Sequence, residues 1–217
     1  MTKVVAVLGT ATEVGKTWMT AALASELRSR DFSVAARKPA QSFDPADPSP
    51  TDAVVLGAAT HEPPTVVCPT QRWYPTPMAP PMAAAALGRT VPMLGELVAE
   101  TAFPAVDITF VETAGGVRSP IASDGDCLDF VRALHPDVIV LCADAGLGTI
   151  NSVRLCLTAI HSPTVITFLN RFDGHTPLHA LNRDWLRDTD GYAIATSIRE
   201  LADHIANHLF GGEHSNS

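Results

Sequence analysis

The chain has 217 residues, enough for one α/β domain with a buried core and too few for two ordinary domains with a linker. Apolar residues make up 46% and charged residues 18%, which is typical of globular rather than disordered chains. The net charge of −8 argues against nucleic-acid binding, which needs a clustered basic surface. We therefore expect a single domain over residues 1–210, a disordered tail over 211–217 and small-molecule partners.

Nothing in the N-terminal region or in the cysteine spacing indicates export, membrane insertion or a zinc site. The first apolar run has about five residues, whereas a bilayer crossing needs roughly 20. A signal peptide's charged, apolar and cleavage regions are not recognisable. Cys68, Cys127, Cys142 and Cys156 form no C-x-x-C pair. The sequence predicts a cytoplasmic protein with reduced thiols and no membrane contact.

Short apolar runs alternate with amphipathic stretches along the chain. The runs are nearly continuous, as in parallel strands buried on both faces, and cover residues 3–8, 33–37, 108–112, 138–143 and 164–170. The amphipathic stretches have the spacing of crossover helices and cover residues 16–29, 51–60, 93–100, 127–134, 149–159 and 178–188. This alternation predicts a doubly wound α/β fold with a mostly parallel sheet and helices on both faces.

Two proline-rich segments interrupt this alternation, and one more helix follows it. Residues 43–50 and 62–81 read as rigid loops, because proline cannot continue a helix. Long ordered loops of this kind are often functional. Ser197-Ile-Arg-Glu200 fits a capping box, so we expect a final helix that begins there and ends near Leu209.

The most informative motif follows the first strand. Gly9-Thr-Ala-Thr-Glu-Val-Gly15-Lys16-Thr17 opens a helical pattern, which is the context of a P-loop that holds nucleoside triphosphate. Backbone N–H groups and the helix N-terminus would receive phosphate oxygens, Lys16 would reach the β and γ phosphates, and Thr17 would offer a hydroxyl to Mg²⁺. The first glycine lies one residue before its usual place, because position 10 is threonine.

Several charged side chains follow other strands, at the sheet edge where open α/β folds bind ligands. Lys38 and Ser42 follow the second strand, although an exposed charge at a strand end is an alternative for Lys38. Asp52 either complements a helix dipole or helps to bind Mg²⁺. Glu112 ends a buried apolar strand before Ala114-Gly115-Gly116, which favours a ligand role. Thr17, Asp52 and Glu112 would together supply a Mg²⁺ site.

Two further loops belong to the same predicted edge. Gly146-Leu-Gly148-Thr-Ile-Asn151 follows a strand and either shapes a site for an organic substrate or is a plain strand-to-helix turn. Asn170 ends the next strand, and its amide can pair with a purine edge.

Taken in chain order, these motifs resemble dethiobiotin synthetases over about residues 3–200. The resemblance rests on seven motifs: the offset loop with Thr12-Glu13, Lys38-Pro39 with Ser42, Thr51-Asp52-Ala53, the run from Pro77 to Pro80, Glu112 before Ala114-Gly115-Gly116, the run from Gly146 to Asn151, and Asn170. It implies an ATP-dependent, Mg²⁺-dependent cyclo-ligase that closes the ureido ring of dethiobiotin from 7,8-diaminopelargonic acid and CO₂. The family is dimeric, with its substrate near the subunit interface.

The resemblance also implies a role for individual residues. Catalysis would involve Thr12, Lys16 and Lys38. Substrate binding would involve Lys38, Ser42, Gly146 and Asn151, and metal binding Thr17, Asp52 and Glu112. Nucleotide binding would involve Glu13, Val14, Gly15, Lys16, Thr17, Trp18, Glu112, Thr113, Ala114, Gly115, Asn170 and Arg171.

Three departures from the family pattern bear on these assignments. Thr113 stands where glycine is expected and would narrow the turn beside the phosphates. The segment 192–197 lacks a proline expected after the last strand, where the base is held. The segment between Ser42 and Asp52 is rich in Pro and Asp, which would alter access to the site.

Two other functions share the P-loop. An amidoligase of the cobyrinic-acid diamide synthase kind would need a glutaminase domain, for which the chain has no room. A partitioning or regulatory ATPase would carry an extra lysine near position 11, where this chain has Ala11. Of these functions, the sequence favours the formation of dethiobiotin.

Overall fold

The computed structural model describes residues 1–162 and 164–211, and its central feature is a six-stranded sheet. The strand order is β2-β5-β1-β6-β7-β8, and each pair of neighbours is parallel. The strands are β1 (Lys3–Gly9), β2 (Val34–Arg37), β5 (Ile108–Glu112), β6 (Val138–Asp144), β7 (Val165–Asn170) and β8 (Ala193–Ala195). The predicted doubly wound fold is confirmed.

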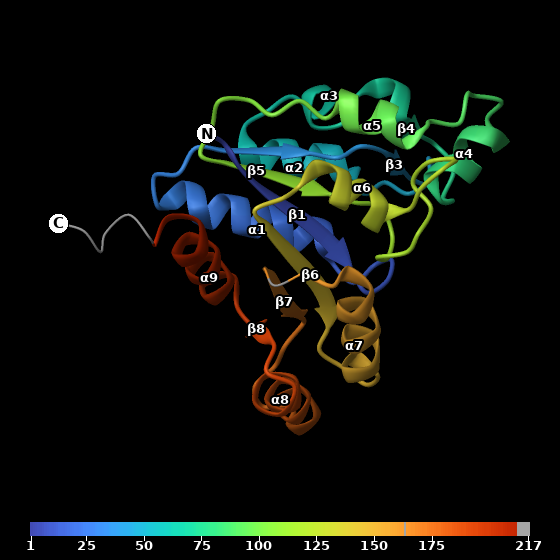
Figure 1. Cartoon of the computed structure of the whole chain (residues 1–217). Helices are drawn as coiled ribbons and strands as arrows, with labels where there is room; N and C mark the ends of the chain where they lie inside the picture. The colour runs from blue at the N-terminus through green and yellow to red at the C-terminus, as the bar shows by residue number, and fades with distance from the viewer. Residues whose placement is uncertain (163, 212–217) are drawn as a thin grey trace.

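Alternation along the strands divides the core into two layers. Val5 and Val7 of β1 face a cluster with α1 (Lys16–Ser29) and α9 (Ile198–Phe210), which lie side by side in Figure 1. Ala6 and Leu8 face the opposite cluster. That second layer holds α5 (Leu94–Glu100), α6 (Cys127–Leu134) and α7 (Thr149–Ile160). Because side chains alternate between the faces of a strand, a continuous apolar run builds both layers.

The proline-rich segment 62–81 contains more regular structure than the sequence predicted. It holds α3 (Pro64–Val67), a 3₁₀ turn (Thr70–Arg72), β4 (Trp73–Tyr74) and the start of α4 (Pro80–Ala86). Pro64 and Pro80 each stand in the first helical turn, where proline needs no hydrogen-bond donor. β4 pairs with β3 (Gln41–Ser42), and α2 (Asp52–Thr60) packs on α1.

Two predictions at the C-terminal end need correction. The helix expected over 178–188 is α8 (Pro177–Asp184), continued by a π-helical turn (Trp185–Thr189). Ser197 Oγ accepts from Glu200 N as expected, but Glu200 Oε2 accepts from Thr196 N, at 2.8 Å, so only half of the capping box forms. Of the predicted tail 211–217, residues 212–217 lie outside the described residues. In the described part, no helix has the length and apolarity to cross a membrane.

Candidate functional site

The predicted phosphate loop joins β1 to α1 and contains two residues in left-handed backbone conformations. Glu13 has φ 60° and Gly15 has φ 92°. A Cβ atom on Gly15 would lie 2.0 Å from Nδ2 of Asn170, so glycine is required both by the backbone angle and by the neighbouring side chain.

Asn170 and Arg171, at the end of β7, donate side-chain hydrogen bonds to the backbone of this loop. Asn170 Nδ2 donates to Val14 O at 2.8 Å, and Arg171 Nη2 donates to Glu13 O at 2.9 Å. Arg171 also pairs with Asp144 at 2.8 Å. Because a trans peptide points its C=O and the following N–H in opposite directions, the N–H groups of Val14 and Gly15 point away from β7. Asn170 Nδ2 thus serves the loop, and its Oδ1 remains as an acceptor for a ligand.

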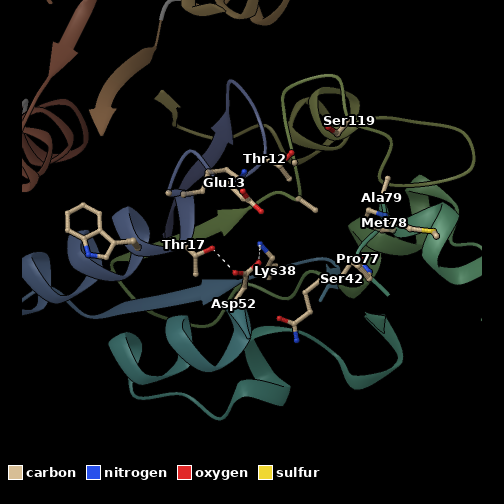
Figure 2. Close-up of a pocket in the computed structure, with 17 residues that line it drawn as sticks. Thr12, Glu13, Thr17, Lys38, Ser42, Asp52, Pro77, Met78, Ala79 and Ser119 are labelled. Atoms are coloured by element: carbon tan, nitrogen blue, oxygen red, sulfur yellow. Dashed lines mark hydrogen bonds and ion pairs between the residues drawn. The ribbon is translucent and has the colours of Figure 1, made fainter. Parts of the chain in front are cut away.

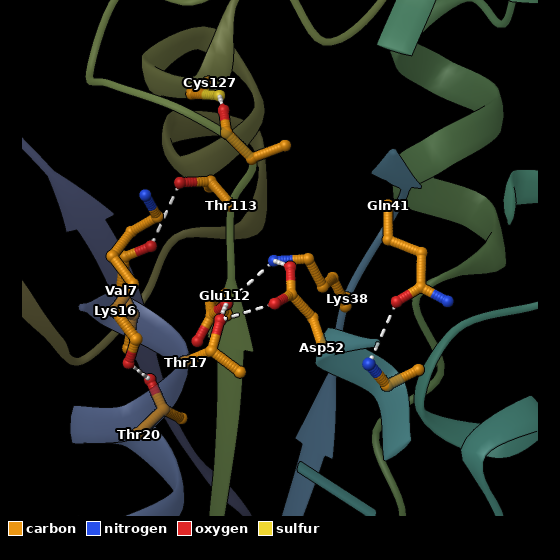
Figure 3. Close-up of polar contacts among 12 residues, drawn as sticks. Val7, Lys16, Thr17, Thr20, Lys38, Gln41, Asp52, Glu112, Thr113 and Cys127 are labelled. Carbon is orange, nitrogen blue, oxygen red and sulfur yellow. Dashed lines mark hydrogen bonds and ion pairs between the residues drawn. The ribbon is translucent and has the colours of Figure 1, made fainter. Parts of the chain in front are cut away.

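Behind the loop, residues of α1, α2 and β5 meet Lys38, which follows β2. They form one ion cluster, which we call the Lys38 cluster: Thr17, Lys38, Asp52 and Glu112 (Figure 3). Lys38 Nζ lies 2.7 Å from Asp52 Oδ2 and 2.7 Å from Glu112 Oε1. Thr17 Oγ1 lies 2.9 Å from Asp52 Oδ1 and 2.7 Å from Glu112 Oε1. The convergence of Thr17, Asp52 and Glu112 expected from the sequence is confirmed.

The Lys38 ammonium is almost completely buried, and its partners decide its charge. Burial alone would lower the pKa of Lys38, but the ion pairs with Asp52 and Glu112 outweigh it and raise that pKa above its ordinary value. Burial would raise the pKa of Asp52, but Lys38 and the Thr17 hydroxyl hold it below 3.8. These shifts favour a charged Lys38 and a charged Asp52 at neutral pH in the ligand-free fold.

The stability contributed by this ion pair should depend on pH at both extremes. The pKa of Asp52 is lower in the fold than its ordinary 3.8, so its contribution is complete above pH 3.8 and lost as pH falls further. The pKa of Lys38 is raised above 10.5, so its contribution is complete below pH 10.5 and lost as pH rises further. The difference in unfolding midpoint between wild type and Asp52→Asn should be constant near neutrality and shrink in acid. A difference that grows in acid would contradict this assignment.

Lys16 lies beside the Lys38 cluster, in an environment that disfavours its charged form. Its side chain is buried, and Nζ contacts Ala11 O at 3.3 Å. Burial, followed by repulsion from Lys38, lowers the pKa of Lys16. An anion bound at the loop would remove this penalty, which makes Lys16 a strong candidate phosphate ligand.

The donor set of the cluster fits Mg²⁺. Glu112 is 1% exposed, and its Oε2 has no protein partner, which is unfavourable for a buried carboxylate oxygen unless a ligand satisfies it. Two carboxylates and a hydroxyl beside a phosphate loop are the oxygen ligands that Mg²⁺ prefers. Within residues 1–162 and 164–211, no three His, Cys, Asp or Glu side chains form a metal group, so a cation here needs Thr17 and ligand oxygens as well.

Thr113, the departure expected to narrow the turn, does not do so. Its hydroxyl donates to Val7 O at 3.1 Å, and the residue is fully buried beneath the sheet edge. Ala114 and Gly115, which follow Thr113, line a cavity above the loop.

A cavity of about 890 Å³ lies over the loop and the Lys38 cluster (Figure 2). Most of its lining was predicted from the sequence: Thr12, Glu13, Gly15, Lys16, Thr17, Trp18, Lys38, Ser42, Asp52, Ala114 and Gly115. Its far end is formed by residues 77–80. Figure 2 shows Pro77, Met78 and Ala79 on the side of the cavity away from Thr17. One end of the cavity is therefore charged and the other largely apolar.

Two polar lining residues, Gln41 and Ser119, were not assigned a role from the sequence. Ser119 Oγ accepts from Gly116 N at 2.8 Å and supports the glycine turn. For Gln41 a signal existed, since it lies between Lys38 and Ser42, both of which were assigned a role. Ser119 lies in a segment without a recognisable pattern.

A second cavity, of about 440 Å³, adjoins the first at Gly15 and Trp18. The remaining lining comes from β7, the residues after it and the start of α9, and consists of Phe168, Asn170, Arg171, Phe172, Thr196, Ser197 and Ile198. Trp18 is 58% exposed, which is unusual for an indole and leaves its ring available to a planar ligand.

Gly146 and Asn151 are not brought to either cavity. Asn151 is exposed on α7, and the Gly146 carbonyl accepts from Asn182 Nδ2 at 2.9 Å. β6 lies on the side of β1 away from β5, so the loop after β6 emerges away from Lys38 and Glu112. Leu147, between the two glycines of that loop, is 92% exposed.

Replacing Gly15 with alanine should abolish nucleotide binding and lower stability, because the new Cβ would meet the Asn170 side chain at 2.0 Å. Gly191→Ala is the matched control: its φ of 72° is also positive, but no atom lies within 4 Å of the new Cβ. The control should cost only the backbone strain of about 1–2 kcal/mol and leave binding intact. Calorimetry with ATP and thermal unfolding measure both effects. Equal losses of binding in the two variants would contradict a role for the Gly15–Asn170 contact.

Comparison with known proteins agrees with this geometry. A family model described as an AAA domain matches residues 3–169. The ATP-dependent dethiobiotin synthetase BioD of Rhodococcus jostii (strain RHA1) is 36% identical over 96% of this chain and 91% of its own. That of Caulobacter sp. (strain K31) is 37% identical over 73% of this chain and 70% of its own.

Solved structures support the fold. The signal recognition particle receptor FtsY from Elizabethkingia anophelis has a TM-score of 0.56 at 14% identity, over 97% of this chain and 66% of the receptor chain. This chain therefore spans just under two thirds of the receptor's length, and the similarity extends to the fold alone. The family is shown by the two dethiobiotin synthetases and by the family model, not by the receptor structure. The chain belongs to the ATP-dependent dethiobiotin synthetase family.

Proposed function

We propose that this protein uses ATP to close the ureido ring of dethiobiotin from 7,8-diaminopelargonic acid and CO₂, with release of ADP and phosphate. The observation that carries the proposal is the Lys38 cluster, which faces the same cavity as the phosphate loop. A cation and two carboxylates next to a triphosphate site suit the activation of an anion by phosphoryl transfer.

The nucleotide would be held by the loop and by the second cavity. Val14 and Gly15 offer N–H groups and Lys16 its ammonium to the phosphates, while Asn170 Oδ1, Arg171 and Trp18 border the space for the base. Thr17, Asp52 and Glu112 would hold Mg²⁺, which when bound neutralises phosphate charge. Glu13, Ala114 and Gly115 complete this wall of the first cavity.

The diamine would occupy the remainder of the first cavity, with its reacting end at Lys38, Ser42 and Thr12. Addition of CO₂ to one amine releases a proton to solvent and gives a carbamate anion, which the Lys38 ammonium would stabilise. Its oxygen takes the γ-phosphoryl group of ATP, ADP leaves, and a carbamic-phosphoric anhydride results. The second amine attacks the carbonyl carbon and expels phosphate, and because both amines belong to one substrate, positioning supplies much of the rate.

We further propose a homodimer in which the loop after β6 faces the partner's cavity. Gly146 and Asn151 line neither of the two cavities described above, and Leu147 beside them and Leu155 on α7 are 92% and 64% exposed. Exposed leucines favour burial by association. Light scattering after size exclusion tests the dimer, and Leu155→Glu should weaken it. We also place the protein in the cytoplasm, which suits its four free cysteines.

The function is tested by incubating the purified protein with Mg²⁺, ATP, bicarbonate and 7,8-diaminopelargonic acid. We expect ADP and phosphate to appear only when the diamine is present, together with dethiobiotin detected by mass spectrometry. ATP hydrolysis that does not depend on the diamine would reject the assignment and leave nucleotide binding at the loop intact.

A further inference from the structure

Gln41 is a buried polar residue to which neither the sequence motifs nor the proposed reaction gives a role. It stands on β3 next to Ser42, is 1% exposed and lines the first cavity. A buried amide has four hydrogen-bonding positions to satisfy, and one left unpaired is costly. The contacts of its two ends differ.

The amide oxygen of Gln41 caps a helix. Oε1 accepts from Ala53 N at 2.9 Å (Figure 3), and Ala53 is the second residue of α2. The preceding Thr51 makes no side-chain cap, so Gln41 supplies from another element the bond that an N-cap residue usually makes. The first residue of α2 is Asp52, whose carboxylate belongs to the Lys38 cluster.

The amide nitrogen of Gln41 has no protein partner. Because the donor Ala53 N must face the oxygen, the other end of the amide is the NH₂ group. Nε2 is buried and unpaired, and the neighbouring Ser42 Oγ is unpaired as well. An NH₂ group only donates, so it selects an acceptor such as an anionic oxygen and disfavours an ammonium.

We propose that Gln41 has two roles: its oxygen positions Asp52 through the start of α2, and its NH₂ group donates to the carbamate oxygens of the carboxylated diamine. The second role rests on the proposed function, and the first does not. Gln41 is thus a positioning residue for the metal carboxylate and a specificity residue for the substrate.

Two substitutions separate these roles. Gln41→Met keeps the approximate size and removes both polar ends. Gln41→Glu keeps an oxygen for Ala53 N–H and replaces the NH₂ group with an oxygen that donates only when the carboxyl is protonated. Gln71→Glu is the matched control, because Gln71 is exposed and away from the first cavity.

Mg²⁺ titrations at a fixed concentration of a non-hydrolysable ATP analogue test the first role. Gln41→Met should raise the Mg²⁺ concentration for half-maximal binding about fivefold, the usual effect of losing a cap. In Gln41→Glu and Gln71→Glu, the Mg²⁺ concentration for half-maximal binding should stay within about twofold of the wild-type value. An unchanged titration in Gln41→Met overturns the positioning role.

The KM for the diamine tests the second role. Gln41→Glu should raise it about tenfold or more at high pH, the usual effect of losing a bond to a charged group. The ratio of the KM of Gln41→Glu to the wild-type KM, measured at each pH, should fall as pH decreases. At low pH the carboxyl introduced at position 41 is protonated and can donate a hydrogen bond again. An increase that does not vary with pH, or no increase, overturns the substrate role. If wild type shows no diamine-dependent turnover, the function and the substrate role fail together, and the Mg²⁺ titration still decides the positioning role.

Discussion

Replacing Lys16 with alanine should lower kcat about 10³-fold, the effect of removing a preorganised charge that stabilises a transition state. The folded protein should not lose stability, because burial and repulsion from Lys38 already disfavour the Lys16 cation in the ligand-free fold. The expected signature is therefore loss of turnover with an unchanged or raised unfolding midpoint. ADP release and thermal unfolding measure the two quantities.

Lys3→Ala serves as the control for Lys16→Ala. Lys3 also carries one positive charge, but it lies at the start of β1 and pairs with Asp137 at 3.1 Å on the surface. Its loss should leave kcat unchanged and cost at most about 1 kcal/mol of stability. Turnover retained in Lys16→Ala, or lost equally in both variants, would remove Lys16 from the proposed reaction.

Replacing Glu112 with glutamine should damage both stability and metal dependence. Lys38 loses the more deeply buried of its two anionic partners, and breaking such a buried pair costs about 3 kcal/mol or more. An amide also binds Mg²⁺ more weakly than a carboxylate, so half-maximal turnover should require at least about tenfold more Mg²⁺. Initial rates across a Mg²⁺ series, with unfolding in parallel, provide the measurement.

Glu26→Gln removes a carboxylate that forms a surface pair with Arg30 and should leave the Mg²⁺ curve unchanged. If Glu112→Gln gives the same Mg²⁺ curve as wild type, the assignment of Glu112 to the metal site is wrong. A loss of stability with an unchanged curve would leave Glu112 as a structural partner of Lys38.

The sequence predicted the sheet well because strands buried on both faces leave a strong apolar pattern. β5 was predicted with its observed bounds, and β1 within one residue. β3 and β4 have two residues each, too few for any periodicity to appear. α4 was missed because Pro80 read as a helix breaker, although proline is well suited to the first turn that it occupies.

The candidate site was predictable wherever its side chains follow strands directly. Parallel strands end at one edge, so Lys38 and Glu112 were both placed at that edge from the sequence, and in the structure they form an ion pair there. The roles assigned to these residues remain predictions. The contact of Asn170 with the phosphate loop and the cap that Gln41 places on α2 depend on distances between elements, which one sequence does not encode as a pattern.

The charges around the phosphate loop have a consequence for the order of binding. Lys16 and the Lys38 cluster together hold two basic and two acidic side chains, so their formal charges cancel in the ligand-free fold. A free divalent cation gains little long-range attraction from a neutral group, and it must also compete with Lys38 for the same carboxylate oxygens. Entry as the preformed complex with a triphosphate would avoid both obstacles, since the phosphates would then pair with Lys16. We therefore expect the protein to bind the preformed complex of Mg²⁺ and triphosphate, and its occupancy to depend little on the concentration of free Mg²⁺.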